Sequence, residues 1–324
     1  MGIQNRMGIQ TRNGKALEFA FLNSFVQKLN NDKILIESSN QLITAKEAYF
    51  SFDQEKINEM NKASLAGINE LLKLEPGLLI GENPLLFAIQ QDSKGQAGDV
   101  RDVVAKREKD GWEFGISCKI NHTAVKHSRI SSKIDIGESW FGFRSTKEYF
   151  ENIIPLFQEL DELKKKGTFW RDLEDKAEKY YKPILTALNV ELRALDNKYP
   201  GEIPKRLLSY LLGRNDFYKA IVNTHSKTTE IQGFNIYGTL NKTVKSKKPQ
   251  LKVPQLKLPN RFYDIHFKEG SNNTLMIVCD EGWTISARIH NASSKVENSL
   301  KLDVKIAGLP PNLYRQVVSW NEQV

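Results

Sequence analysis

Residues 95–120 read GQAGDVRDVVAKREKDGWEFGISCKI and hold the clearest structural pattern in the chain. Residues 112–120 alternate strictly, so their apolar side chains would share one face of a strand and Glu113, Gly115, Ser117 and Lys119 the other. The preceding Lys-Asp-Gly is a turn sequence, and residues 99–107 form a second strand candidate. We therefore expect a hairpin with Asp99 at the start of one strand and Lys119 on the polar face of the next.

Helical and strand patterns surround this hairpin. Apolar spacing predicts a helix over residues 15–30 and another that follows the capping-box pair Ser51 and Gln54 and ends near Pro76. Residues 85–91 add a strand, and a helical pattern that begins with the capping-box pair Ser145 and Glu148 covers residues 145–212. Further strand candidates are residues 217–222, 262–267, 275–280, 284–290 and 300–306. We predict a mixed α/β fold of the α+β class, divided into regions 1–144, 145–213 and 214–324.

Length and composition set broad limits on the function. A chain of 324 residues is long enough for about two domains. Its 47 Lys and Arg against 39 Asp and Glu give a formal charge of +8, which suits an anionic partner without identifying one. No apolar run approaches the ~18 residues of a membrane span, and two cysteines in apolar runs form no disulfide framework. We expect a cytoplasmic protein.

The hairpin carries residue types that suit metal-dependent hydrolysis of a phosphodiester. Carboxylates can hold Mg²⁺, which neutralises phosphate charge and lowers the pKa of a bound water, and a nearby lysine can stabilise the developing charge. In this hypothesis Asp99 is the main metal ligand, Lys119 the cationic partner, and Ser117 a neighbour on the same face. Glu18 on the first helix is a further candidate acid. The competing interpretations are a surface pair of Asp99 with Lys119 and a solvent-facing Glu18.

Three polar segments are candidates for DNA contacts. The first follows residue 120 and is rich in hydrogen-bond donors, the second is a basic, proline-containing arm at 242–261, and the third closes a strand at 288–295. The candidate DNA-binding residues are His122, Lys126, His127, Ser128, Arg129, Lys245, Lys248, Arg288, Asn291, Ser293, Ser294 and Lys295. A polar loop, a solvated linker and a plain hairpin loop are the respective alternatives.

Several longer runs resemble the HaeIII-type type II restriction endonucleases. These runs are KGQAGDVRDVV (94–104), WEFGISCKINHTAVKHSRIS (112–131), IDIGESW (134–140) and WTISARIHNASSKVENSLKLDVKIAGLPPN (283–312), and the resemblance extends from Gly14 to Trp320. It implies a Mg²⁺-dependent endonuclease of the PD-(D/E)XK superfamily that cuts double-stranded DNA at GGCC and leaves 5′-phosphate and 3′-hydroxyl ends. The implied nuclease core is a helix, three strands, a further helix and a strand.

The resemblance also implies roles for single residues. Asp99 matches the first acid of the superfamily, Lys119 its lysine and Glu18 the frequent glutamate of the first helix. Asp99 and Glu18 are therefore the expected metal ligands. The superfamily usually has an acid two residues before the lysine, where this chain has Ser117. Glu138, from a later segment, is the alternative candidate for the missing carboxylate.

Other functions and assemblies stay open at this point. Because Ser117 replaces an acid, a sequence-specific DNA-binding protein without nuclease activity is the alternative, and an RNA nuclease is a third hypothesis. A palindromic target would suit a homodimer, and a monomer acting on each strand in turn is equally compatible with the sequence. The resemblance further implies a cognate DNA methyltransferase that protects the same site.

Overall fold

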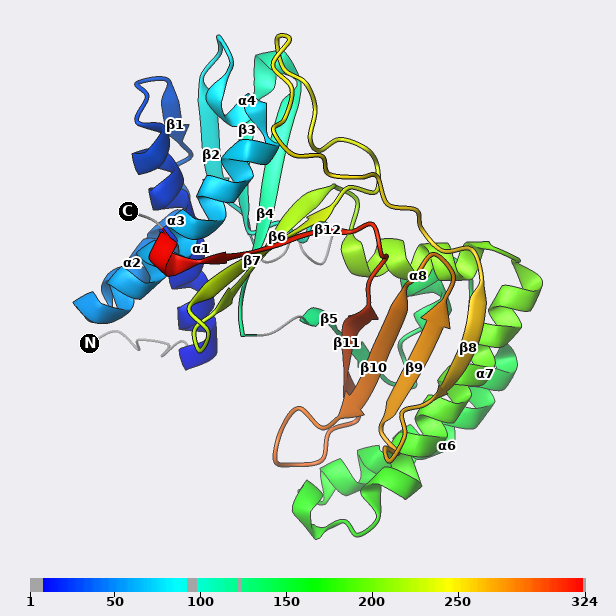
Figure 1. Ribbon diagram of the computed structural model, residues 1–324. Coiled ribbons are helices and arrows are strands. Elements are labelled where there is room, and N and C mark those ends of the chain that lie inside the picture. The colour runs from blue at the N-terminus through cyan, green and yellow to red at the C-terminus, as the bar shows by residue number, and fades with distance from the viewer. Residues whose placement is uncertain (1–7, 92–97, 122–123, 323–324) are drawn as a thin grey trace. The chain divides into compact units, whose positions relative to one another are not determined.

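The computed structural model describes residues 8–91, 98–121 and 124–322, and it describes only the backbone of residues 124–127 and 322 (Figure 1). The chain divides into two compact units, each assembled from separate stretches of sequence. The first comprises Met1–His122, Gly213–Leu256 and Asn312–Val324, and the second comprises Thr123–Leu212 and Lys257–Pro311. These units cut across the three consecutive regions expected from the sequence.

A seven-stranded sheet forms the centre of the first unit. Its strands, in spatial order, are β1 (Ile34–Ile36), β2 (Leu85–Ile89), β3 (Val103–Arg107), β4 (Trp112–Ile120), β6 (Phe217–Asn223), β7 (Thr228–Phe234) and β12 (Tyr314–Ser319). Strands β2, β3 and β4 are antiparallel neighbours, whereas β6 pairs with β4 in parallel. The chain therefore leaves the sheet after β4 and returns beside it.

Helices cover one face of this sheet. They are α1 (Ile9–Leu29), α2 (Asn40–Phe50), α3 (Gln54–Leu74) and the short α4 (Pro76–Leu79), with α1 and α3 against the strands in Figure 1. Phe25 of α1 packs against Phe87 and Phe114, and the apolar positions of β4 and β6 are buried in the same core. Because side chains alternate along a strand, Ser117 and Lys119 fall on the opposite face from this core.

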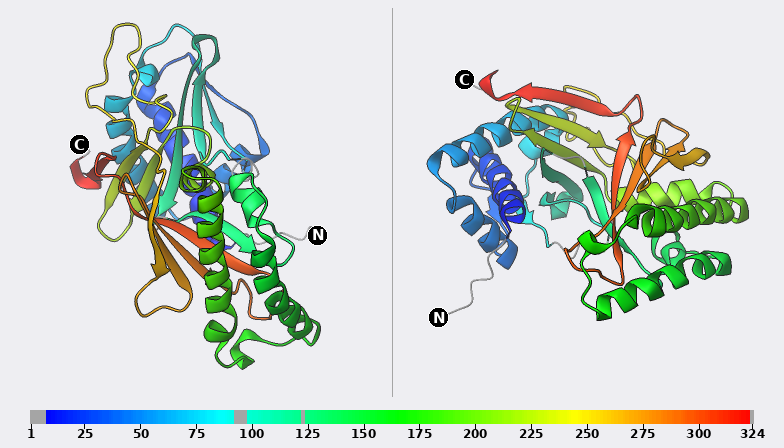
Figure 2. Two further views of the ribbon diagram at one scale, coloured as in Figure 1. Left: turned by 90° about the vertical axis from the view of Figure 1, so that its right-hand side faces the viewer. Right: turned by 90° about the horizontal axis from the view of Figure 1, so that it is seen from below.

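The second unit contains an antiparallel five-stranded sheet. Its order is β5 (Ala124–Ile130), β11 (Leu300–Gly308), β10 (Thr284–His290), β9 (Thr274–Cys279) and β8 (Phe262–Phe267). The helices α6 (Lys147–Lys165), α7 (Lys182–Lys198) and α8 (Glu202–Leu212) lie together on one face of it (Figure 2). The opposite face carries the polar positions of β10 and β11, which alternate with buried Ile, Leu and Val.

The mixed α/β class expected from the sequence is confirmed, and several element boundaries differ. Strand β4 covers 112–120 as predicted, but β3 begins at Val103 and not at residue 99. The segment after residue 121, expected as a DNA-contacting loop with a plain polar loop as the alternative, includes strand β5. Helix α1 begins at Ile9, and the caps of α3 and α6 are Asp53 and Thr146 rather than Ser51 and Ser145.

The basic arm 242–261 has the extended, irregular course that its prolines predict, and no part of it is helical. It is fastened to the first unit at several points. The amide of Gln250 donates to the carbonyl of Lys73 at 2.8 Å, and the Val253 side chain is buried in the core. Within the described ranges, no helix combines the length and apolar content needed to cross a bilayer.

Candidate active site

Asp102 lies at the centre of a polar cluster on the first unit. Its amide donates to the carbonyl of Ile116 at 2.7 Å, which continues the β3–β4 register by one residue and brings Asp102 opposite Ser117. One carboxylate oxygen, Oδ2, accepts hydrogen bonds from Cys118 N at 2.6 Å, Ser117 Oγ at 3.1 Å and Lys119 Nζ at 3.3 Å. The entry to β3 and the end of β4 therefore hold a carboxylate and an ammonium group together.

Electrostatics keep Lys119 charged at this position. Burial is the largest single influence and lowers the pKa of Lys119, but the charge and hydrogen bond of Asp102, together with the charges of Cys118 and Glu18, raise it by more in sum. The pKa of Lys119 is therefore above its ordinary value. A lysine in this state acts as a fixed positive charge and as a hydrogen-bond donor, not as a proton acceptor.

Glu18 lies on α1, which packs against the core face of the sheet, and it acts on the polar cluster through its charge. It is 8% exposed, and its Oε2 accepts a hydrogen bond from Lys15 Nζ at 3.1 Å, one helical turn earlier. The negative charge of Glu18 acts on strand β4, where it contributes to raising the pKa values of both Cys118 and Lys119. The sequence hypothesis that Glu18 faces solvent is thus not what the structure shows.

Asp99, by contrast, belongs to a separate ion-pair cluster. Arg101 donates to Asp99 Oδ1 and Oδ2, each at 2.7 Å, and also binds Glu113, while Gln90 donates to Asp99 at 2.9 Å. Burial raises the pKa of Asp99, but these hydrogen bonds outweigh it and leave the pKa lowered. The expected pairing of Asp99 with Lys119 is replaced by a pairing of Asp102 with Lys119.

Gly115 makes the Arg101 cluster possible. This glycine lies on the polar face of β4, and a Cβ built there would lie 2.2 Å from Cδ of Arg101. The arginine therefore crosses the strand where a side chain is missing. Because β3 begins only at Val103, residues 99–101 have an irregular course, and Arg101 folds back from there.

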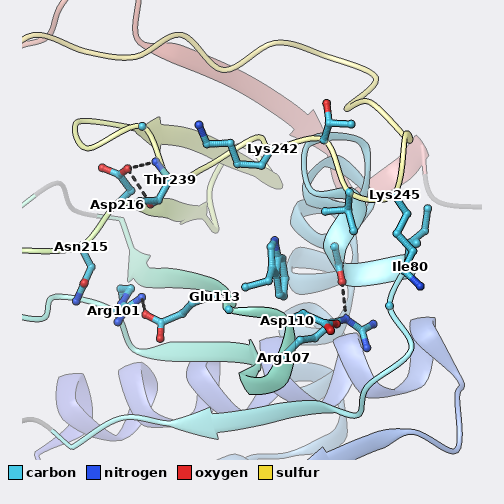
Figure 3. A pocket seen from close by; sticks show the side chains of 17 residues that line it. Ile80, Arg101, Arg107, Asp110, Glu113, Asn215, Asp216, Thr239, Lys242 and Lys245 are labelled. Carbon is cyan, nitrogen blue, oxygen red and sulfur yellow. Dashed lines mark hydrogen bonds and ion pairs between the residues drawn. The ribbon is translucent and has the colours of Figure 1, made fainter.

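A pocket of about 680 Å³ borders this ion-pair cluster and is distinct from the Asp102 centre (Figure 3). Its wall includes Arg101, Glu113, Asp216 and Lys242. In Figure 3 the Asp216 carboxylate turns to Thr239, whose amide donates to it at 2.7 Å. The labelled charged groups around the pocket thus mostly serve contacts that hold neighbouring segments.

The Asp102 centre has the donor set that Mg²⁺ uses in nucleic-acid enzymes. Mg²⁺ is usually held by one or two carboxylates, with water and substrate phosphate completing its shell. Asp102 Oδ1 accepts no hydrogen bond from the described residues, and the side chain is 24% exposed, so this oxygen can reach a cation. The part of the chain that the structure describes has no group of three or more His, Cys, Asp or Glu placed to hold a metal. Asp102 therefore fits the role of a metal-binding carboxylate, and Glu18 is a further acid whose charge acts on Cys118 and Lys119, the residues that donate to Asp102.

Several predicted site residues lie elsewhere. Glu138 is exposed in the π-helical turn Gly137–Phe141 of the second unit, and its role stays a prediction. On the basic arm, Lys245 pairs with Glu82, and Lys248 is exposed. His122 lies outside the described residues, as do the side chains of Lys126 and His127, although the backbone of the latter two belongs to β5.

The predicted DNA-contact residues of the second unit fall into two groups. Ser128 is buried against Tyr210, and Asn291 accepts from Tyr181 while donating to the Ser293 carbonyl, so these groups hold the fold. The Ser293 hydroxyl donates to the carbonyl of Lys295, the carbonyl of Ser294 accepts from Trp170, and Lys295 lies over the Phe169 ring. Arg129 and Arg288 instead lie on the exposed side of the sheet.

The exposed side of the five-stranded sheet is basic. Pairing places Lys301 opposite both Arg129 and His290, Arg288 opposite Asp303, and Lys305 opposite Ser286. Asp303 is engaged by His290 Nε2 at 2.8 Å, and Glu297 pairs with Arg129. Sequence reasoning missed Lys301 and Lys305, although the alternation of residues 300–306 could have placed them on this face.

Comparisons with known proteins cover nearly the whole chain. A family model described as HaeIII restriction endonuclease matches residues 14–310. The chain is 41% identical over 311 residues to the type II restriction enzyme HaeIII of Haemophilus aegyptius. The aligned region covers 96% of this chain and 98% of that protein. No solved structure gives a significant match.

Proposed function

Because the chain belongs to the HaeIII restriction endonuclease family, we propose that Asp102, Glu18 and Lys119 form its centre for cleaving double-stranded DNA. The family membership makes the chain a site-specific restriction endonuclease, and type II restriction enzymes generally use divalent metal ions. The finer proposal is that the metal is Mg²⁺ and that the target is GGCC.

One observation supports this centre above the others. The carboxylate of Asp102 and the ammonium of Lys119 lie 3.3 Å apart at the meeting point of two adjacent strands, and the other carboxylate oxygen, Oδ1, accepts no hydrogen bond from the described residues. The parallel strand β6 beside β4 also fits the strand order of a PD-(D/E)XK core. Ser117 donates to Asp102 and orients it, so it positions a ligand where the superfamily usually has a second one.

The residues of the centre divide the chemistry between them. Asp102 and Glu18 would hold Mg²⁺, which supplies charge neutralisation and water activation when it is bound. Lys119 stays protonated and donates toward the phosphate oxygens, which stabilises the charge that develops during in-line attack. Cys118 contributes its amide, which fixes the Asp102 carboxylate. We expect products with 5′-phosphate and 3′-hydroxyl ends.

We propose that the basic side of the five-stranded sheet binds the DNA. Arg129, Arg288, Lys301 and Lys305 give it four positive charges, against Asp303 on the paired strands and Glu297, which pairs with Arg129. Arginine and lysine neutralise backbone phosphates, and arginine can also read guanine edges in the major groove. Lys245 and Lys248 of the basic arm remain candidates for further phosphate contacts.

The palindromic target carries two further proposals. Two-fold symmetry of GGCC would match a homodimer in which each copy cuts one strand. A host that makes this endonuclease would need a cognate DNA methyltransferase acting on the same site, as a functional and not necessarily physical partner.

Cleavage of plasmid DNA tests the proposed function. Incubation with Mg²⁺ should give discrete fragments with ends inside GGCC, and chelator or prior methylation of GGCC should prevent them. Lys119→Ala should lose cleavage while retaining salt-sensitive DNA binding. Binding without cleavage by the unaltered protein, in Mg²⁺ and in Mn²⁺, would instead identify a DNA-binding protein that lacks nuclease activity.

A further inference from the structure

Lys219 occupies a position for which the proposed function assigns no task. It lies on β6, where parallel pairing with β4 places it beside Ser117, and the residue is 6% exposed. Directly paired residues of neighbouring strands project to the same face, and their backbones lie ~4.8 Å apart. Lys219 therefore projects from the face that carries Ser117 and Lys119.

The two lysines are close enough to repel each other. Burial, followed by the charge of Lys119, lowers the pKa of Lys219 to about 8, with Glu230 acting in the opposite direction. Asp102 helps to keep Lys119 charged, so the repulsion between the two ammonium groups lowers the pKa of Lys219 and not that of Lys119. In the protein without DNA, a buried ammonium beside a second one is destabilising. An anion bound next to both groups relieves their repulsion.

Ser117 gives this face its unusual charge. The superfamily pattern has an acid at that position, so the neutral serine gives the site one negative charge fewer than the pattern would. The register continues across the sheet from Lys219 to Gln232 on β7 and Arg315 on β12. A polar row thus crosses four strands, and Lys219 is the member next to the Asp102 centre.

We propose that the ammonium of Lys219 contacts the scissile phosphate together with Lys119 and supplies positive charge that a second metal ion would otherwise supply. The ligand is a DNA phosphodiester, because its single negative charge is divided between two oxygens that two lysines can contact. This inference rests on the proposed function, since it requires DNA at the Asp102 centre. It assigns Lys219 a role in phosphate binding.

Binding measurements on the full chain test this assignment. Lys219→Met keeps the buried aliphatic stem and removes the charge, whereas Lys219→Arg keeps the charge. The control is Lys56→Met, which makes the same change at a lysine of α3 that pairs with Glu59. Each variant is titrated with GGCC duplex in Ca²⁺ over a range of salt. The duplexes are unmodified or carry one uncharged methylphosphonate at each phosphate of the site in turn.

We expect Lys219→Met to bind on the order of tenfold more weakly, as for the loss of one charge-assisted hydrogen bond. The slope of log K against log salt should fall by about one. At one phosphate only, the methylphosphonate should weaken DNA binding less in Lys219→Met than in the unaltered protein, because Lys119 still contacts that phosphate in the variant. Thermal unfolding of Lys219→Met without DNA should occur at the same or a higher temperature, which a residue needed only for the fold would not show.

Additive penalties at every phosphate, or an unchanged salt slope, would overturn the role of Lys219. Should Lys219→Met not fold, the same titrations with unmodified and methylphosphonate duplexes can be made with Lys219→Gln. A failure of the unaltered protein to prefer the GGCC duplex over a scrambled one is a different result, because it overturns the proposed function itself.

Discussion

Two aspartates three residues apart show what single residues reveal in the sequence and what they do not. Asp99 and Asp102 flank the same short segment, and both stand near the predicted strand. The choice between them depends on where β3 begins and on Arg101, which folds across Gly115 to bind Asp99. Neither fact follows from spacing, although a glycine on the polar face of β4 was a visible sign that another group crosses there.

Lys119 and Glu18 were both selected from the sequence, whereas Lys219 was not. The alternation of residues 112–120 places Lys119 on the polar face without further information. Lys219 is separated from it by 100 residues, and only the parallel register of β4 with β6 brings Ser117 and Lys219 together. Contacts of this range depend on the tertiary fold, so no local pattern predicts them.

Glu75 should make the stability of the protein fall as the pH rises. Burial raises its pKa from 4.5 to about 7, despite hydrogen bonds from Asn241 and Tyr218. The folded state therefore binds more protons than the unfolded state between these values, and the free energy of unfolding decreases through that window. Glu75→Gln keeps an acceptor oxygen and should raise the free energy of unfolding by about 1–3 kcal/mol at pH 8 and by little at pH 4.5.

Urea unfolding of Glu75→Gln and the unaltered protein at both pH values measures this difference. A Gln variant that is equally or less stable at pH 8 would show that the charged carboxylate is well accommodated.

At the scale of elements, strong periodicity was predictable and weak periodicity was not. Strands β4, β8 and β10 have the bounds expected from alternation. Strands β1, β7 and β12 were not predicted, because β1 is three residues long and β7 and β12 contain polar side chains whose pairing is decided by their sheet neighbours. The cap of α6 was assigned one residue early, since Ser145 and Thr146 have equivalent chemistry.

Gly115→Ala tests how far β4 depends on the crossing arginine. The added methyl would overlap Cδ of Arg101, so the ion pairs with Asp99 and Glu113 must shift. We expect a loss of about 1–3 kcal/mol in the free energy of unfolding, as for other overpacking changes. Gly14→Ala in α1 meets no atom within 4 Å and should be neutral or stabilising. Equal stability of the two variants in urea would contradict the Arg101 geometry.

At the scale of the whole molecule, two discontinuous units separate the proposed tasks. The first unit holds the Asp102 centre, and the second holds the basic sheet face. The net charge of +8 indicated an anionic partner, but only the strand register shows which basic residues share a surface. The fold class could thus be predicted from patterns, while the division into units could not, because each unit joins segments far apart in the chain.

The DNA-binding role of the sheet face predicts a salt effect. Arg288→Ala and Lys305→Ala should each weaken binding of the GGCC duplex and lower the salt slope by about one. Lys147→Ala, on an exposed position of α6 that pairs with Glu151, should leave the slope unchanged. Three identical slopes in a fluorescence titration would remove this face from the DNA interface.

The comparison of Asp102→Asn with Asp99→Asn tests the catalytic centre most directly. Both changes remove one charge and keep the side-chain size, and their rates of GGCC duplex cleavage in saturating Mg²⁺ can be measured beside thermal unfolding. We predict that Asp102→Asn cleaves at least ~10³-fold more slowly while folding and binding DNA. Asp99→Asn should lose stability and keep cleavage within about tenfold of the unaltered rate. Loss of cleavage in Asp99→Asn with near-normal cleavage in Asp102→Asn would contradict the Asp102 centre.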